Sequence, residues 1–151
     1  MYKYILVSII NISLILLILS GCSDDSNPVN GDNTTHFEAI GLYLIESGDT
    51  IVSYLGGTVT GQIEVTDSTE TPLIFVKFLT DEGTVGTPQG PEHSLQLSVA
   101  DTSIATPETH QGEDWEFHIK GKQIGQTALE ISIFHNDHPD FISRPIPIIV
   151  N

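Results

Sequence analysis

From residue 36 onward, apolar and polar residues alternate over short runs, and turn-forming residues separate the runs. The runs span residues 37–46, 50–55, 58–65, 73–79, 94–100, 114–120, 127–135 and 145–150. A period of two predicts strands with one buried face. Turn residues at intervals of about 8–12 positions are typical of an all-β sandwich or barrel. After residue 22 no stretch keeps a helical period, so we expect no long helix.

The alternation also predicts which side chains face the core. In 114–120 the aromatic and aliphatic positions fall on one face, and Glu116, His118 and Lys120 fall on the other. In 127–135 the inner face ends on His135. We expect Trp115 to be the large anchor of the core, and the buried face to hold Trp115, Phe117, Leu129, Ile131 and Ile133.

The last run, 145–150, contains two prolines, Pro145 and Pro147. Proline has no backbone N–H to give to a neighbouring strand, which confines it mainly to edge strands. The pattern therefore predicts an edge strand whose inward residues are Ile146, Ile148 and Val150.

The N-terminal segment differs in character from the rest. A single early lysine, Lys3, precedes a 15-residue apolar run from Ile5 to Leu19. This is the pattern of a secretory signal and is short for a membrane-spanning helix, which needs about 20 residues. The next residues, 19–22 (Leu-Ser-Gly-Cys), resemble the bacterial lipobox, and they contain the only cysteine of the chain.

The lipobox resemblance implies that residues 1–21 are a cleaved lipoprotein signal peptide. It implies that Cys22 carries diacylglycerol and acyl lipid. Residues 22–35 are almost entirely polar and small, which predicts a flexible tether between this lipid and a domain at 36–151. No Asp directly follows Cys22, so we expect attachment to the outer membrane, on its periplasmic or surface face.

Composition narrows the possible partners. The chain has 151 residues with 5 Lys+Arg and 20 Asp+Glu, a formal net charge of −15. Such a chain repels the phosphate backbone, which excludes a nucleic-acid partner. With 39% apolar and 17% charged residues, most of it is expected to fold. The partners we expect are the membrane, through the lipid, and either a divalent metal or an envelope protein.

Two segments are similar to bacterial Ig-like group 2 domains. Residues 94–105 end in Asp-Thr-Ser-Ile-Ala, and residues 125–133 begin Gly-Gln-Thr and continue into an apolar strand. The family implies an Ig-like β-sandwich of about seven strands, used as a surface, adhesion or spacer module, without catalytic residues. The sequence departs from the family in lacking its first-strand Trp and in a longer loop at residues 135–141.

Histidine placement is the unusual chemical feature. His135 and His138 form an H-x-x-H motif followed by Asp140, in a segment we expect to be a loop. Histidine and carboxylate are ligands of Zn²⁺ and Cu²⁺. We expect His118, on a strand near 127–135, to be the third ligand, and His36 to be the fourth. Asp140 and Glu38 are expected to orient these ligands from outside.

An alternative explains the same residues. Exposed hairpin loops carry His, Asn, Asp and Pro for turn formation alone. His93 and His110 lie in turn-rich segments and are expected outside any site. The sequence therefore supports two interpretations of its function: a metal-binding protein, or an adhesion or structural module that binds no metal. We expect no enzyme, because the sequence has no nucleophile, phosphate-loop or zinc-protease motif.

The lipobox generates the first prediction. A Cys22→Ser variant should accumulate as unprocessed precursor, because serine has no thiol to accept the lipid. Mass spectrometry of the native protein should find an acylated N-terminus at Cys22. A native N-terminus at any other residue, without acyl mass, contradicts the lipid anchor.

Overall fold

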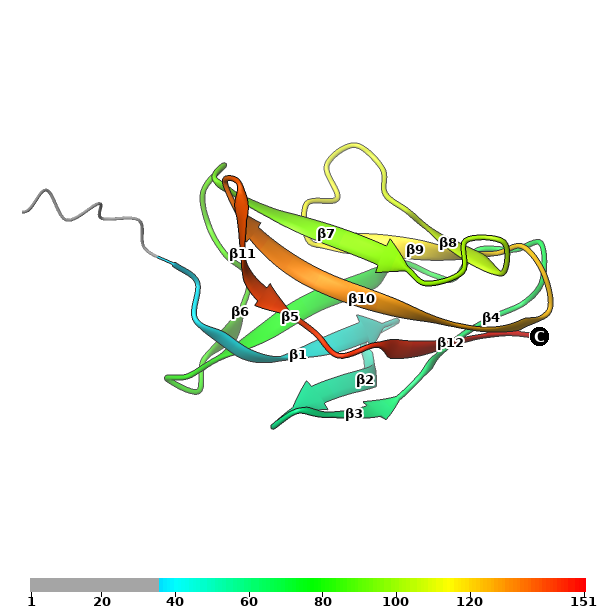
Figure 1. Cartoon of the computed structure of the whole chain (residues 1–151), viewed down its shortest axis with the longest axis horizontal. Coiled ribbons are helices and arrows are strands. Elements are labelled where there is room, and N and C mark those ends of the chain that lie inside the picture. The colour runs from blue at the N-terminus through cyan, green and yellow to red at the C-terminus, as the bar shows by residue number, and fades with distance from the viewer. Residues whose placement is uncertain (1–35) are drawn as a thin grey trace, which may run out of the picture. The chain divides into compact units, whose positions relative to one another are not determined.

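The computed structural model describes residues 36–151, whose regular elements are all β-strands (Figure 1). The predicted signal peptide, Cys22 and tether lie outside the described residues. Among residues 36–151 no helix is long and apolar enough to cross a membrane. The predicted all-β sandwich is confirmed.

Residues 36–151 contain twelve strands, several of them short, where about seven were expected. The first sheet runs β3-β2-β1-β5-β9-β8, with β6 paired to β5. Its strands are β1 (Ala39–Glu46), β2 (Asp49–Leu55), β3 (Thr58–Gly61), β5 (Ile74–Thr80), β6 (Val85–Gly86), β8 (Ala105–Glu108) and β9 (Glu116–Gly121). The second sheet runs β11-β10-β12-β4, with β7 paired to β10. Its strands are β4 (Ile63–Val65), β7 (His93–Val99), β10 (Gly125–His135), β11 (His138–Ile142) and β12 (Ile146–Val150).

The alternating residues of both sheets meet in one core. In the first sheet, Leu42 of β1 pairs with Phe78 of β5, and both are fully buried. In the second sheet, β10 pairs with β7 along one edge and with β11 and β12 along the other. The predicted inward residues that are buried are Phe117, Leu129, Ile131, Ile133, Ile146, Ile148 and Val150.

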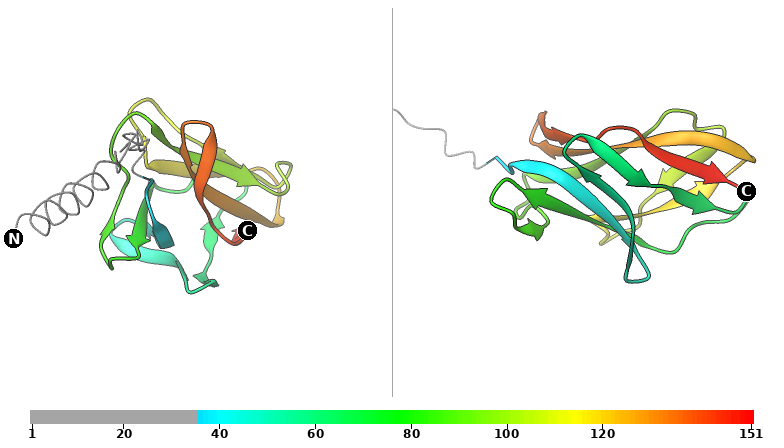
Figure 2. Two further views of the ribbon diagram at one scale, coloured as in Figure 1. Left: turned by 60° about the vertical axis from the view of Figure 1, so that its left-hand side comes forward. Right: turned by 90° about the horizontal axis from the view of Figure 1, so that it is seen from below.

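The sandwich has two distinct ends. The first described residues and the β10–β11 turn lie at one end, and the C-terminus lies at the other (Figures 1 and 2). Segments from the start of the chain and from near its end therefore come together at one end of the sandwich.

The run 58–65 is not one strand, as predicted, but two. Gly61 ends β3 with a φ of 90°, and β4 then joins the other sheet beside β12. A Cβ at Gly61 would lie against the carbonyl oxygen of Ile51, so both the turn and the close approach require glycine. The chain changes sheets at this residue.

The prediction of an edge strand at 145–150 is wrong, although the inward faces are correct. β12 lies between β10 and β4. β4 pairs only with Ile148–Val150, so it stops short of Pro147. Proline is tolerated at this position because no strand pairs with Pro147 on the β4 side, where a backbone N–H would otherwise be needed.

The core anchor is also different from the prediction. Trp115 precedes β9 and is only partly buried, whereas Phe78 is fully buried. The Phe78 ring makes edge contacts with Phe37, Trp115 and Phe141, with centroids 5.6–6.1 Å apart. Phe78 therefore joins the two sheets, and Trp115 covers it from the side.

These contacts predict the order of two truncations. Phe78→Ala should lower the free energy of unfolding by about 3–5 kcal/mol, the usual cost of deleting a buried aromatic. Trp115→Ala should cost less, because its ring already contacts solvent. Urea denaturation monitored by circular dichroism measures both. A Trp115→Ala variant less stable than Phe78→Ala contradicts this assignment of the core.

Candidate metal centre

The H-x-x-H motif lies on a tight hairpin and not on a long loop. β10 ends at His135, β11 begins at His138, and Asn136 and Asp137 form the turn. Asn136 has a φ of 54°, a conformation that asparagine tolerates in two-residue hairpins. His135 and His138 are directly paired, so their side chains lie on the same face of the sheet.

A third histidine extends this pair into a row. His93, the first residue of β7, pairs with His135 from the opposite edge of β10. Their rings stack with centroids 4.8 Å apart and an angle of 20° between planes. Because His135 continues the inward alternation of β10, its side chain is only 3% exposed, and that of His93 is 5% exposed.

A β-bulge brings Asp140 into the same space. Ile133 pairs with Phe141 and Phe134 pairs with Pro139, which leaves Asp140 as an extra residue on β11. An extra residue rotates the strand locally and re-aims a side chain. As a result, Asp140 and the adjacent Phe141 are both directed inward, and the Asp140 side chain is 3% exposed.

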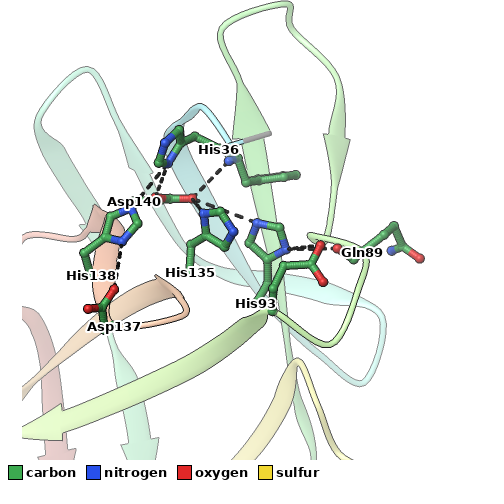
Figure 3. A network of polar contacts seen from close by, with 9 residues as sticks. His36, Gln89, His93, His135, Asp137, His138 and Asp140 are labelled. Atoms are coloured by element: carbon green, nitrogen blue, oxygen red, sulfur yellow. Dashed lines mark hydrogen bonds and ion pairs between the residues drawn. The ribbon is translucent and has the colours of Figure 1, made fainter. Parts of the chain in front are cut away.

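The Asp140 carboxylate also holds the start of the domain. His36 Nδ1 donates a hydrogen bond to Asp140 Oδ1 at 2.8 Å, and the backbone N–H of Phe37 donates to Oδ2 at 3.1 Å. These contacts join residues more than a hundred positions apart and place His36 above the hairpin (Figure 3).

Four side chains that can each provide a metal ligand lie close together at this end of the sandwich. A ligand atom from each of His36, His135, His138 and Asp140 lies within 4.8 Å of all the others. His138 Nε2 is 3.3 Å from Asp140 Oδ1 and 3.4 Å from His36 Nδ1. Two ligands of a tetrahedral zinc ion with bonds of about 2.0–2.1 Å lie roughly 3.3 Å apart. The two distances from His138 Nε2 match this spacing.

Two buried nitrogen atoms near Asp140 have no hydrogen-bond partner among the described residues. They are His135 Nδ1 and His93 Nε2, and each lies 3.9 Å from Asp140 Oδ2. His93 Nδ1 donates to the carbonyl of Gln89 at 2.9 Å, so in the neutral ring Nε2 presents a lone pair. A lone pair that faces a carboxylate oxygen in a buried place favours a cation between them.

Asp140 has the charge that such a cation needs. Burial alone would raise the pKa of Asp140, but hydrogen bonds from the His36 ring and the Phe37 N–H, with the nearby imidazoles, lower it below its usual value. The carboxylate is therefore ionised throughout the neutral range. On the outer side, the fully exposed Asp137 lies 3.6 Å from His138 Nδ1, beyond hydrogen-bond distance.

The predicted convergence of His118 with this group is wrong. His118 lies on β9 in the first sheet, whereas His135 and His138 belong to the second. The sequence order placed its strand beside 127–135, but β9 pairs with β5 and β8. His118 lies in a separate group with His110 and Glu113.

The other predicted residues are placed as follows. His36, His135 and His138 converge, and Asp140 lies among them as a direct donor where an outer orienting role was expected. Glu38 lies outside the group of four and lines a hollow beside His36, with Asp81 and Glu82. His93 lies outside the group of four, but its contact with the His135 ring was not predicted, because only strand pairing brings the two together.

No family model and no curated protein matches the chain. A solved structure of the S-layer protein SbsC, domains 4 and 5, is similar over 60% of this chain, with 14% sequence identity and a TM-score of 0.42. The match spans 47% of that chain, less than half of its length.

Proposed function

We propose that this domain binds a divalent transition metal ion, Zn²⁺ or Cu²⁺, through His36, His135, His138 and Asp140. The observation that carries the proposal is that ligand atoms of three imidazoles and one ionised carboxylate all lie within 4.8 Å of one another, and that Nδ1 of His135 is buried there without a partner. Three nitrogens and one oxygen suit both ions.

The donor set favours binding over catalysis. Four protein ligands fill a tetrahedral ion, as in structural zinc sites, whereas catalytic sites keep a position for water. The ion would connect His36, ahead of the first sheet, to the hairpin of the second sheet. The acidic chain, with a net charge of −15, raises the local concentration of cations around it.

The setting that we propose is the cell envelope, with the domain anchored by lipid on Cys22. This part rests on the lipobox and the polar segment that follows it. In this proposal the chain is a binding protein at the outer membrane. The resemblance to Ig-like surface modules supports the same setting.

Metal titration tests the proposal. The full chain, without an affinity tag and kept in detergent, is titrated with ZnCl₂ or CuCl₂ in a calorimeter. Asp140→Asn should weaken binding by more than about tenfold, and His135→Ala/His138→Ala should abolish the tightest event. The matched control is Asp49→Asn, the same substitution on an exposed aspartate of β2 in the other sheet. The same weak response in all four proteins favours the non-metal surface module.

The pH dependence gives a second test. An imidazole must be neutral to bind a metal, and its ordinary pKa is about 6.5. The pKa of Asp140 is lowered, so this carboxylate stays ionised as the pH falls and the histidines alone govern the loss. Affinity should be highest above pH 7 and fall steeply between about pH 6.5 and 5. Calorimetry across this range that shows constant affinity contradicts histidine ligation.

A further inference from the structure

A second group of donors lies on the first sheet, on the hairpin formed by β8 and β9. Ligand atoms of His110, Glu113 and His118 all lie within 4.8 Å of one another. We propose that these three residues form a separate divalent-metal site, with two histidines and one glutamate as ligands and at least one coordination position open to water. This site is independent of the centre at His135.

His118 is held in a metal-ready orientation. Its Nδ1 donates a hydrogen bond to the carbonyl of Thr71 at 2.9 Å, and a carbonyl oxygen only accepts. In the neutral ring, Nε2 therefore presents its lone pair. A ligating histidine usually gives its other nitrogen to a carbonyl or carboxylate in this way. Thr71 is itself fixed, because its hydroxyl accepts the N–H of Ile119 at 3.0 Å.

The His118 lone pair faces a carboxylate oxygen. His118 Nε2 lies 3.7 Å from Glu113 Oε1, and both side chains are only 18% exposed. Two acceptors at this distance make no hydrogen bond with each other. A divalent ion between them would satisfy both, at a separation close to that of two ligands on one ion.

The turn before β9 positions the other two donors. Glu113 Oε2 accepts the backbone N–H of His110 at 2.7 Å and lies 3.1 Å from His110 Nδ1, which leaves Oε1 directed at His118. The His110 and His118 rings lie 5.2 Å apart, almost perpendicular. Burial alone would raise the pKa of Glu113, but the His110 hydrogen bonds and the two imidazoles lower it, so Glu113 is ionised near neutral pH.

Lys120, two residues after His118 on β9, is engaged elsewhere. It pairs with Glu70 at 3.3 Å and with Glu108 at 3.6 Å. His110 is 58% exposed, so one side of the site is open to solvent. Two histidines and one glutamate are the donor set of open zinc sites, which keep an exchangeable water. We expect weaker binding here than at the centre that holds His135.

The test measures the zinc binding that remains after the centre at His135 has been removed by mutation. The full-length His135→Ala/His138→Ala chain, untagged and in detergent, is titrated with ZnCl₂ in a calorimeter. One binding event per chain should persist. Glu113→Gln and His118→Ala, each added to this background, should weaken it by more than about tenfold. Glu130→Gln, on an exposed glutamate of β10, is the matched control and should leave it unchanged. Circular dichroism without metal checks that each variant is folded. If His118→Ala does not fold, Glu113→Gln still tests the site, because glutamine has nearly the same shape as glutamate.

The outcomes separate the two sites. If the His135→Ala/His138→Ala chain binds no zinc while the wild type binds one ion, the second site does not exist and the first proposal stands. If the His135→Ala/His138→Ala chain binds as the wild type does, and Glu113→Gln removes that binding, the second site stands and the first proposal is wrong. An event equally strong in the Glu113→Gln and Glu130→Gln variants overturns the second site.

Discussion

The register of β10 is the constraint on which both the second sheet and the candidate centre depend. This strand pairs along both edges, and its inward positions Leu129, Ile131 and Ile133 are fully buried. The same period of two then directs His135 inward, because a strand cannot turn one side chain outward without breaking the alternation. Burial of an unpartnered polar nitrogen costs about 1–3 kcal/mol, so the fold has a polar group where an apolar one would be more stable. A bound cation at this position would offset that cost.

Alternation predicted the inner faces because it depends only on neighbours along the chain. The inward positions of 127–135 and 145–150 were predicted correctly for this reason. The split at Gly61 was not predicted, since both halves of 58–65 have strand character and only the φ of 90° separates them. Trp115 was overestimated because residue size predicts burial, but its position before the start of β9 leaves part of its ring in solvent.

The candidate centre was predicted only in part, because it depends on strand pairing. His135 and His138 are three positions apart, so the motif was visible, although a hairpin with a bulge replaced the expected loop. His93 reaches the centre through its pairing with His135, and no local pattern in the sequence gives this register. His118 was assigned to the wrong sheet for the same reason. The one signal in the sequence that could have suggested this contact is that His93, like His135 and His138, lies at the end of a strand.

Asp140 explains why the centre lies at one end of the sandwich. Its two oxygens hold His36 and the backbone of Phe37, so one carboxylate fixes the start of the domain against the last hairpin. The Phe37 ring contacts Phe78, which carries this attachment into the core. A metal ion would replace the proton between His36 and Asp140 with two stronger bonds at the same position. The ion would therefore strengthen an attachment that these hydrogen bonds already make, and its effect would fall on the first residues of the domain rather than on Phe78 and the two sheets.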